Sequence, residues 1–176
     1  MKYFDELVRA MDMLSSNPKT IFIGQSVVWD GHALFKTLKN VPLGKRLEMP
    51  VAEDMQMGFS TGLALEGFIP ISIFPRWDFL ILAMNQMVNH LDKVPLLGSM
   101  TPKVIIRTSV GSKKPLDPGL QHCQDYTEAI KKMVKTLDVI DLIEPEQIYP
   151  SYEKALTRLD RSSTLLVEHM DFYNDK

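Results

Sequence analysis

The chain has 176 residues, the length of one compact domain, and 45% of them are hydrophobic and 24% charged. This balance is typical of a folded globular domain and excludes a disordered chain. The formal net charge of −2 lacks the basic surplus that phosphate neutralisation requires, which argues against nucleic acid as the main partner. A single cysteine, Cys123, cannot form an internal disulfide, and no uncharged apolar run approaches the ~20 residues that cross a bilayer. We therefore expect a soluble cytoplasmic domain without a membrane partner.

The first predicted element is a helix over residues 4–14, where hydrophobic residues recur at helical spacing. Short apolar runs without strict alternation follow, and this pattern is typical of strands buried on both faces of a parallel sheet. These runs cover residues 20–24, 69–74, 104–106, 139–143 and 165–167, and a short strand at residues 46–49 completes a set of six.

Further helices are predicted between the strands. They cover residues 53–66, 77–93, 125–135 and 146–160, and Gly67 is a natural C-terminal cap for the first of these four. Helices that alternate with buried strands predict an α/β fold, a three-layer α/β/α domain with a mostly parallel six-stranded sheet. No linker divides the chain, so residues 1–176 are expected to form a single domain.

Common catalytic and cofactor motifs are absent from the sequence. Gly24 follows the first strand without the G-x-G-x-x-G pattern of dinucleotide-binding folds, and there is no Walker lysine. The four histidines lack the spacing of metal ligands, so no metal site is predicted. Cys123 beside His122 is only a weak indication of a nucleophilic dyad, because neighbours in sequence usually point apart.

Two features are not explained by packing alone. Glu53 lies where a strand leads into a helix, and the carboxyl ends of parallel strands are where ligands bind. The simpler interpretation is that the negative charge of Glu53 interacts favourably with the dipole of the helix at its N-terminus. The helix over 77–93 carries Asn85, Gln86 and Asn89 where a solvent-facing side would carry charges, which indicates a face buried against another chain.

The segment 50–67, PVAEDMQMGFSTGLALEG, resembles the region around the essential glutamate of thiamine-diphosphate-dependent enzymes. The resemblance is greatest to the beta subunits of the decarboxylating component of 2-oxoacid (pyruvate) dehydrogenases, and transketolase is more distant. It continues in the same order along nearly the whole chain, through residues 68–71, 77–79, 85–86, 104–107, 121–124 and 165–168. The chain is thereby identified as similar to the transketolase-like pyrimidine-binding domain of this superfamily.

The resemblance implies thiamine diphosphate as the cofactor and roles for four residues. Glu53 matches the carboxyl group that bonds to the pyrimidine ring and drives the tautomer change needed for proton removal at C2. Phe79 matches the aromatic residue on which the pyrimidine stacks, although a plain core phenylalanine competes with that interpretation. His122 matches a loop histidine that faces substrate in relatives, and an ordinary surface-loop histidine is the alternative. Gln25 is the remaining residue that we expect to bind the cofactor.

The sequence also departs from the family pattern. Relatives carry an acidic residue where this chain has Gln25, which leaves no basis for a proton-relay role at that position. No Gly-Asp-Gly motif for magnesium and the diphosphate is present. The resemblance also ends where beta subunits continue, so we expect no C-terminal domain of the kind that they carry. The resemblance therefore implies a partner, a separate diphosphate-binding subunit that holds Mg²⁺, in a homodimer or hetero-oligomer.

The leading hypothesis is the pyrimidine-binding subunit of a split thiamine-diphosphate enzyme that acts on a small-molecule 2-oxoacid or sugar. The reaction is then 2-oxoacid decarboxylation or ketol transfer, and the Gln-His-Cys-Gln sequence at 121–124 favours decarboxylation. The alternative is a non-catalytic binding or assembly module that retains the fold. Retention of Glu53, Phe79 and His122 together argues against that alternative. An unrelated α/β ligand-binding domain is a remote third possibility.

Overall fold

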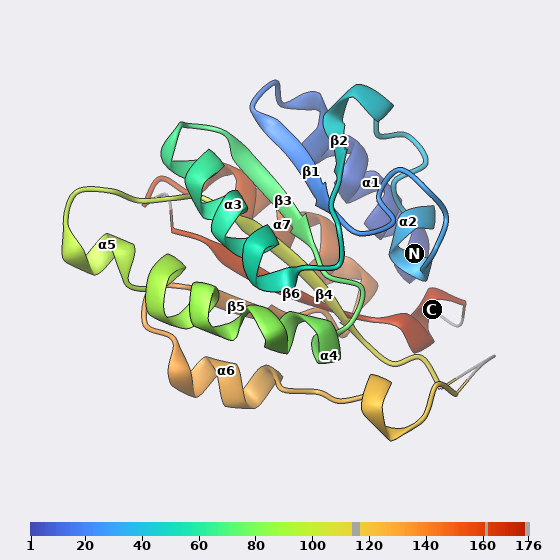
Figure 1. The fold of residues 1–176 in the computed structure, drawn as a ribbon. Helices are drawn as coiled ribbons and strands as arrows, with labels where there is room; N and C mark the ends of the chain where they lie inside the picture. Colours follow the sequence, from blue (N-terminus) through green and yellow to red (C-terminus); the bar gives the residue numbers. More distant parts are fainter. Residues whose placement is uncertain (114–116, 161, 175–176) are drawn as a thin grey trace.

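The computed structural model describes residues 1–113, 117–160 and 162–174, which form a sheet with helices on both faces (Figure 1). The sheet has the strand order β2-β1-β3-β4-β6-β5, and every neighbouring pair is parallel. The strands are Thr20–Gly24 (β1), Arg46–Glu48 (β2), Ile69–Ile73 (β3), Ile105–Val110 (β4), Asp138–Asp141 (β5) and Thr164–His169 (β6). The predicted three-layer α/β/α fold with a parallel six-stranded sheet is confirmed.

Helices cover both faces of this sheet (Figure 1). On one face lie α1 (Tyr3–Ser16), α7 (Pro145–Thr157) and the short α2 (Ala33–Lys36), and on the other lie α3 (Glu53–Leu65), α4 (Trp77–Leu80) and α6 (Thr127–Met133). The remaining helical segments are α5 (Val94–Leu97), a π-helical segment at Asn85–Leu91, and 3-10 turns at Leu43–Lys45, Ile81–Ala83, Leu120–His122 and Met170–Tyr173. No helix in the described ranges is long and apolar enough to span a membrane.

Two separate hydrophobic cores hold the layers together. Successive residues of a strand point to opposite faces, so β4 contributes Ile105 to one core and Ile106 to the other. The first core joins the sheet to α1 and α7, and the second joins it to α3 and the helix that begins at Trp77. Burial on both faces is the reason that the strands show no polar alternation in the sequence.

The structure corrects several predicted element boundaries. The helix expected at 125–135 covers Thr127–Met133 only, and the helix expected at 146–160 covers Pro145–Thr157. The helix expected at 77–93 is continuous in space but contains a 3-10 turn and a π-helical segment. Residue spacing over one or two turns does not distinguish these segments from an α-helix, because the period of each differs from that of the α-helix by less than one residue per turn.

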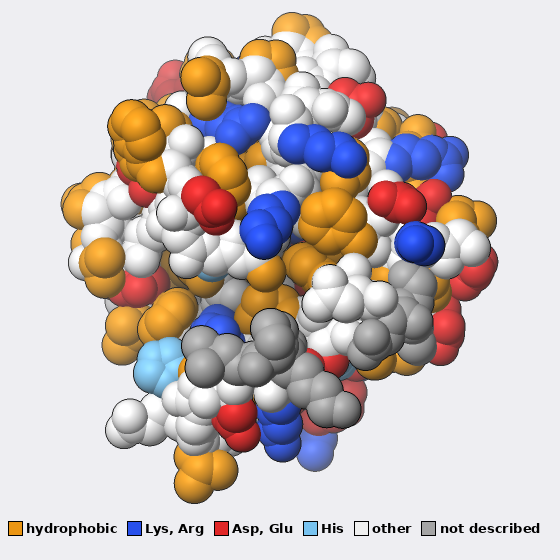
Figure 2. Space-filling model, turned by 90° about the vertical axis from the view of Figure 1, so that its right-hand side faces the viewer, with side chains coloured by type: hydrophobic (Ala, Val, Ile, Leu, Met, Phe, Trp, Pro, Cys, Tyr) orange, Lys and Arg blue, Asp and Glu red, His pale blue; other side chains and the backbone are white. Residues whose placement is uncertain are grey.

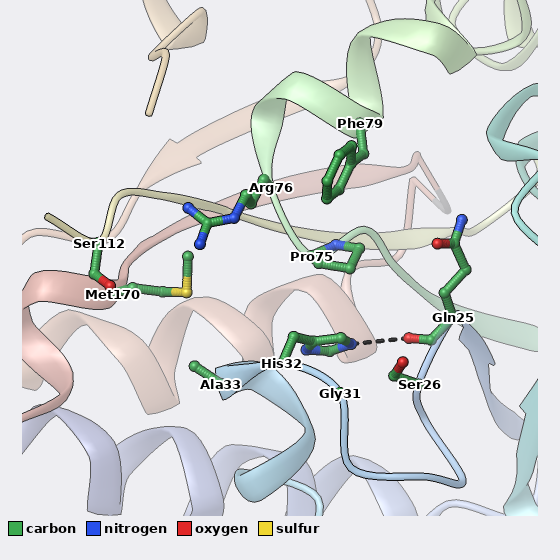
Figure 3. A pocket seen from close by; sticks show the side chains of 10 residues that line it. All are labelled: Gln25, Ser26, Gly31, His32, Ala33, Pro75, Arg76, Phe79, Ser112 and Met170. Carbon is green, nitrogen blue, oxygen red and sulfur yellow. Dashed lines mark hydrogen bonds between the residues drawn. The ribbon is translucent and has the colours of Figure 1, made fainter. Parts of the chain in front are cut away.

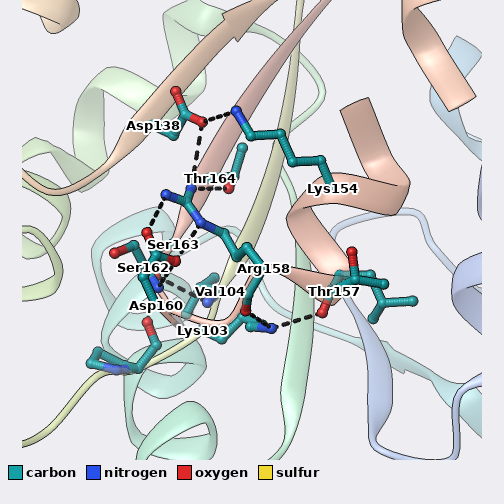
Figure 4. A network of polar contacts seen from close by, with 12 residues as sticks. Lys103, Val104, Asp138, Lys154, Thr157, Arg158, Asp160, Ser162, Ser163 and Thr164 are labelled. Atoms are coloured by element: carbon teal, nitrogen blue, oxygen red, sulfur yellow. Dashed lines mark hydrogen bonds and ion pairs between the residues drawn. The ribbon is translucent and has the colours of Figure 1, made fainter. Parts of the chain in front are cut away.

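Arg158, which follows α7, organises the edge of the sheet where the strands begin (Figure 4). Its Nη1 atom donates to Thr164 Oγ1 at 3.0 Å, on β6, and its Nε atom donates to Asp160 Oδ1 at 2.7 Å. Nη1 also lies 3.5 Å from Asp138 Oδ2, at the start of β5. These contacts hold β5, β6 and the end of α7 together, so the polar residues at the amino-terminal edge have a structural role.

At the opposite edge, β1 and β3 approach each other closely where they end. A Cβ atom on Gly24 would lie 2.4 Å from the Ile73 carbonyl oxygen, so any larger residue would push the two strands apart. Figure 2 views the molecule from this end, where hydrophobic side chains and Lys and Arg side chains lie close together. The carboxyl edge of a parallel sheet is the usual location of a ligand site.

Candidate functional site

A cavity of about 450 Å³ lies at the carboxyl edge of the sheet (Figure 3). It is bounded by the loop after β1, the turn after β3 and the segment after β4. The described residues that line it are Gln25, Ser26, Gly31, His32, Ala33, Pro75, Arg76, Phe79, Ser112 and Met170. Two of the predicted cofactor-binding residues, Gln25 and Phe79, therefore face one cavity.

Glu53 is the first residue of α3, and only 5% of its surface is exposed. Gln25, after β1, donates from Nε2 to Glu53 Oε1 at 3.1 Å. Glu53 Oε2 has no hydrogen-bond partner in the part of the chain that the structure describes. The site thus contains a nearly buried carboxyl group with one oxygen held by the protein and the other available to a ligand.

Gln56 fixes the position of Glu53. It lies one helical turn further along α3, is fully buried, and donates from Nε2 to the Ile73 carbonyl oxygen at 3.0 Å and to Ser72 Oγ at 3.2 Å. These bonds fasten the first turn of α3 to the end of β3. Gln56 is not among the residues proposed from the sequence, although its spacing of three residues from Glu53 places both on one side of the helix.

Phe79 and His122 contact each other although they come from different segments. Their ring centroids are 5.6 Å apart and the ring planes meet at 79°, an edge-to-face contact. Arg76 holds the histidine segment in place, because its Nη1 atom donates to the carbonyl oxygens of Gly111 and His122, the latter at 2.7 Å. The Nδ1 atom of His122 is buried and has no partner among the described residues.

A carboxylate also shapes the loop after β1. Glu48, at the end of β2, accepts the backbone N–H groups of Ser26, Val27 and Val28, the last two at 2.9 and 2.8 Å. Ser26 has a φ of +53°, in the left-handed region. The three hydrogen bonds to one carboxylate offset the energetic cost of this backbone conformation. This loop carries both Gln25 and His32 into the cavity wall.

His32 is a site residue that sequence reasoning missed. Its Nε2 atom lies 2.8 Å from the Gln25 carbonyl oxygen, which can only accept, so Nε2 carries the proton. Burial lowers the pKa of the His32 imidazole below its usual value. The Nδ1 atom is then an acceptor, and it has no partner among residues 1–113, 117–160 and 162–174. No local sequence motif around His32 could have indicated that its Nδ1 atom is an unpartnered acceptor at this site.

Cys123, the other residue considered for catalysis, behaves as an ordinary structural group. Cys123 Sγ lies 3.8 Å from the Ser112 carbonyl oxygen, a weak contact with backbone. Within the described ranges, no cluster of three or more His, Cys, Asp or Glu side chains could hold a metal ion. Of the site residues proposed from the sequence, Gln25 and Phe79 line the cavity. Glu53 and His122 do not line it, but they contact Gln25 and Phe79 respectively.

These groups fit the aminopyrimidine part of thiamine diphosphate. The available Oε2 atom of Glu53 can bond to a ring nitrogen, and Phe79 offers a half-buried aromatic face beside the cavity. A flat heteroaromatic ring with polar edge atoms needs this combination of a placed carboxyl and an aromatic neighbour.

Comparison with known proteins supports the same assignment. No model of a protein family matches the sequence. The pyruvate dehydrogenase E1 component subunit beta of Gracilaria tenuistipitata var. liui is 28% identical over 98% of this chain and 54% of its own length. The subunits of the same name from Cyanidium caldarium and Porphyra purpurea are 23% and 28% identical over 100% and 73% of this chain.

The chain spans about half the length of the first of these curated relatives. A solved structure described as a split gene transketolase, inactive beta4 tetramer, superposes with a TM-score of 0.68 over 96% of this chain and 50% of its own, at 18% identity. That likeness concerns the fold. The sequence similarity to these beta subunits and the likeness in fold together support a transketolase-like pyrimidine-binding domain of the thiamine-diphosphate-dependent enzymes.

Proposed function

We propose that this chain is the pyrimidine-binding subunit of a split thiamine-diphosphate enzyme. The observation that carries the proposal is Glu53, a nearly buried carboxyl group that Gln25 holds by one oxygen and whose other oxygen is available. The contact between Phe79 and His122 beside the same cavity edge adds further support.

In this proposal, each residue has a separate task. Glu53 shares a proton with the pyrimidine ring nitrogen through Oε2, while the Gln25 amide keeps Oε1 in place. Phe79 supports the ring, and His122 faces the carbonyl substrate from the 3-10 turn at Leu120–His122. When bound, thiamine diphosphate supplies the electron sink for bond cleavage next to a carbonyl group.

The diphosphate and its Mg²⁺ are assigned to a second chain. The sequence contains no Gly-Asp-Gly motif, and the described residues form no cluster of three metal-ligating side chains. Mg²⁺ is usually held through carboxylate oxygens together with substrate phosphates. A partner that carries the Gly-Asp-Gly motif would complete the site, and the split transketolase offers an analogous division.

The substrate is proposed to be a 2-oxoacid or a ketose, with decarboxylation or ketol transfer as the reaction. The Gln-His-Cys-Gln sequence at 121–124 and the names of the curated relatives favour a 2-oxoacid. The fold likeness to a split transketolase is the reason to keep ketol transfer as the other reaction.

The assembly surface is proposed to lie on α3 and on the helix that begins at Trp77. Large apolar side chains are exposed on these two elements: Met55 at 49%, Phe59 at 43%, Ile81 at 42% and Leu82 at 61%. Exposed apolar surface of this kind favours association. We propose a homodimer for the chain alone and a hetero-oligomer with the diphosphate-binding partner.

Calorimetry with thiamine diphosphate and Mg²⁺ tests the split site. The partner to use is a chain that carries a Gly-Asp-Gly motif, and the adjacent reading frame is the first place to search for it. We expect weak or no binding to this chain alone and saturable binding to the two chains together. Tight binding by this chain alone would contradict the division of the site.

A further inference from the structure

Arg76 is the only charged side chain among the described residues that line the cavity. It follows β3, in the turn that leads into α4, and it is partly buried. No Asp or Glu oxygen within the described ranges lies within 4.0 Å of its guanidinium group. Within the described residues, the cavity therefore has a positive charge without a protein counter-ion.

Only one side of the guanidinium group is used by the protein. Nη1 donates to the carbonyl oxygens of Gly111 and His122, whereas Nε and Nη2 have no acceptor in the described part of the chain. Figure 3 shows the guanidinium group within the cavity wall, between Phe79 and Ser112. A planar guanidinium with free donors matches the oxygens of a carboxylate or a phosphate, often with two parallel hydrogen bonds.

The neighbouring groups favour a ligand that carries both an anionic group and hydrogen-bonding groups. Ser26 and Ser112 place hydroxyl groups in the same wall. His32 is held as an acceptor at Nδ1 by its bond to the Gln25 carbonyl oxygen, and that Nδ1 atom has no partner among the described residues. A hydroxyl group on the ligand could donate to it.

We propose that Arg76 binds the anionic group of the substrate, a carboxylate or a phosphate, with His32 accepting from a ligand hydroxyl. The proposal rests on the proposed function, because it takes this cavity as the place where the carbonyl substrate enters. It narrows the substrate class to anionic carbonyl compounds. Neutral sugars and simple aldehydes would leave Arg76 without its counter-ion.

Binding is measured on the full chain alone, without thiamine diphosphate, by NMR titration at low ionic strength. The probes are acetate, inorganic phosphate, ribose 5-phosphate and, as the neutral control, ribose. We expect saturable shifts with at least one anion at residues that line the cavity, and no such shifts with ribose. A stronger response to acetate indicates a carboxylate ligand, and a stronger response to phosphate indicates a phosphorylated one.

The variant Arg76→Gln keeps an amide donor for the Gly111 and His122 carbonyl oxygens but removes the charge. We expect affinity for the anion to fall about tenfold or more, because a charge-assisted hydrogen bond is lost. Arg76→Lys should retain part of the affinity, and Lys132→Met, an exposed charge outside the cavity, should leave it unchanged.

Equal binding by wild type and Arg76→Gln, or equal response to ribose and ribose 5-phosphate, would overturn the proposal. If Arg76→Gln does not fold, wild-type shifts confined to exposed lysines rather than the cavity would overturn it. The test uses neither cofactor nor partner. A negative result therefore leaves the proposed function standing, and that function is tested separately by cofactor binding and C2 proton exchange.

Discussion

The side-chain amide of Gln25 donates to the carboxyl group of Glu53 across 3.1 Å, although the two residues are 28 positions apart in the chain. The bond joins the end of β1 to the start of α3, at the edge where parallel strands present ligand sites. The family resemblance leads us to expect an acidic residue at position 25, and this chain has a neutral donor there. That replacement avoids a second negative charge beside Glu53.

The contact between Phe79 and His122 predicts different effects for two substitutions in the complex with the partner. His122→Ala should lower turnover while cofactor affinity stays near wild type, because the proposed function assigns the ring to the substrate and not to the cofactor. Phe79→Ala should instead weaken thiamine diphosphate binding by about tenfold through loss of stacking and buried area. Steady-state kinetics and calorimetry on both variants provide the comparison. Loss of cofactor binding in His122→Ala would make the histidine structural.

Asp92 predicts a pH-dependent loss of stability. Burial would raise the pKa of its carboxyl group, but hydrogen bonds from Lys93 and from the backbone N–H groups of Leu137, Thr136 and Lys135 outweigh it and lower the pKa from 3.8 to about 2. A lowered pKa in the folded state stabilises the fold above pH 4, and this contribution is lost as the pH falls from about 4 to 2.

The variant Asp92→Asn should lower the free energy of unfolding at pH 7 by about 2 kcal/mol, because it removes a charged acceptor from several hydrogen bonds. Its stability should also depend less on pH between 4 and 2 than that of the wild type. Urea denaturation across this range measures both. Asp12→Asn, at an exposed position of α1, is the control and should match the wild type. Parallel pH profiles for Asp92→Asn and wild type would contradict this account.

The ion pair of Arg107 and Glu168 lies entirely within the core. Arg107 Nε donates to Glu168 Oε1 at 2.6 Å, Nη2 donates to Oε2 at 2.9 Å, and neither side chain is exposed. We expect Glu168→Gln to destabilise the fold by about 3 kcal/mol, because it leaves a buried guanidinium group without its counter-ion.

Replacing both partners, as Arg107→Met with Glu168→Leu, should cost less than the sum of the two single substitutions. The exposed pair of Lys131 and Glu128 provides the control, and Glu128→Gln should change stability by less than about 0.5 kcal/mol. Chemical denaturation of these five variants (Glu168→Gln, Arg107→Met, Glu168→Leu, the double variant and Glu128→Gln) and of the wild type checks the set. A loss in Glu168→Gln as small as in the control would show that the pair does not stabilise the core.

Much of the fold follows from the sequence. The strands were recognisable because burial on both faces removes polar alternation, as in β4 with Ile105 and Ile106. Element ends were less predictable, since the limits of α6 and the π-helical segment depend on contacts such as those of Asp92 with the segment 135–137. Local spacing carries no information about such contacts.

The site was only partly predictable. Glu53, Phe79, His122 and Gln25 came from a family resemblance, whereas physical reasoning alone reached no further than Glu53 at a strand-to-helix junction. Their roles remain predictions. Gln56, Arg76 and His32 were missed because their importance arises from partners that folding brings near: for Arg76, the Gly111 carbonyl oxygen lies 35 positions away in sequence. Only the arrangement of the strand ends brings such groups together.

Asn89 tests the proposed assembly surface. It is exposed on the π-helical segment and donates to Asn85 Oδ1 at 3.0 Å. Asn89→Glu should dissociate the assembly while each subunit stays folded, because burying an unpaired charge in an interface is unfavourable. Light scattering with circular dichroism measures both, and Lys39→Glu, an exposed position on another part of the surface, is the control. An unchanged mass for Asn89→Glu with the partner present would place the interface elsewhere.

The most direct test of the central claim is hydrogen–deuterium exchange at C2 of thiamine diphosphate, measured by NMR with this chain and its partner. Asp54→Asn is the matched control, since Asp54 neighbours Glu53 in the first turn of α3 but is exposed. The account predicts that Glu53→Gln folds normally and lowers the exchange rate by about 100-fold or more, the scale of general acid–base catalysis, with Asp54→Asn near wild type. An exchange rate in folded Glu53→Gln equal to that of the wild type would contradict it.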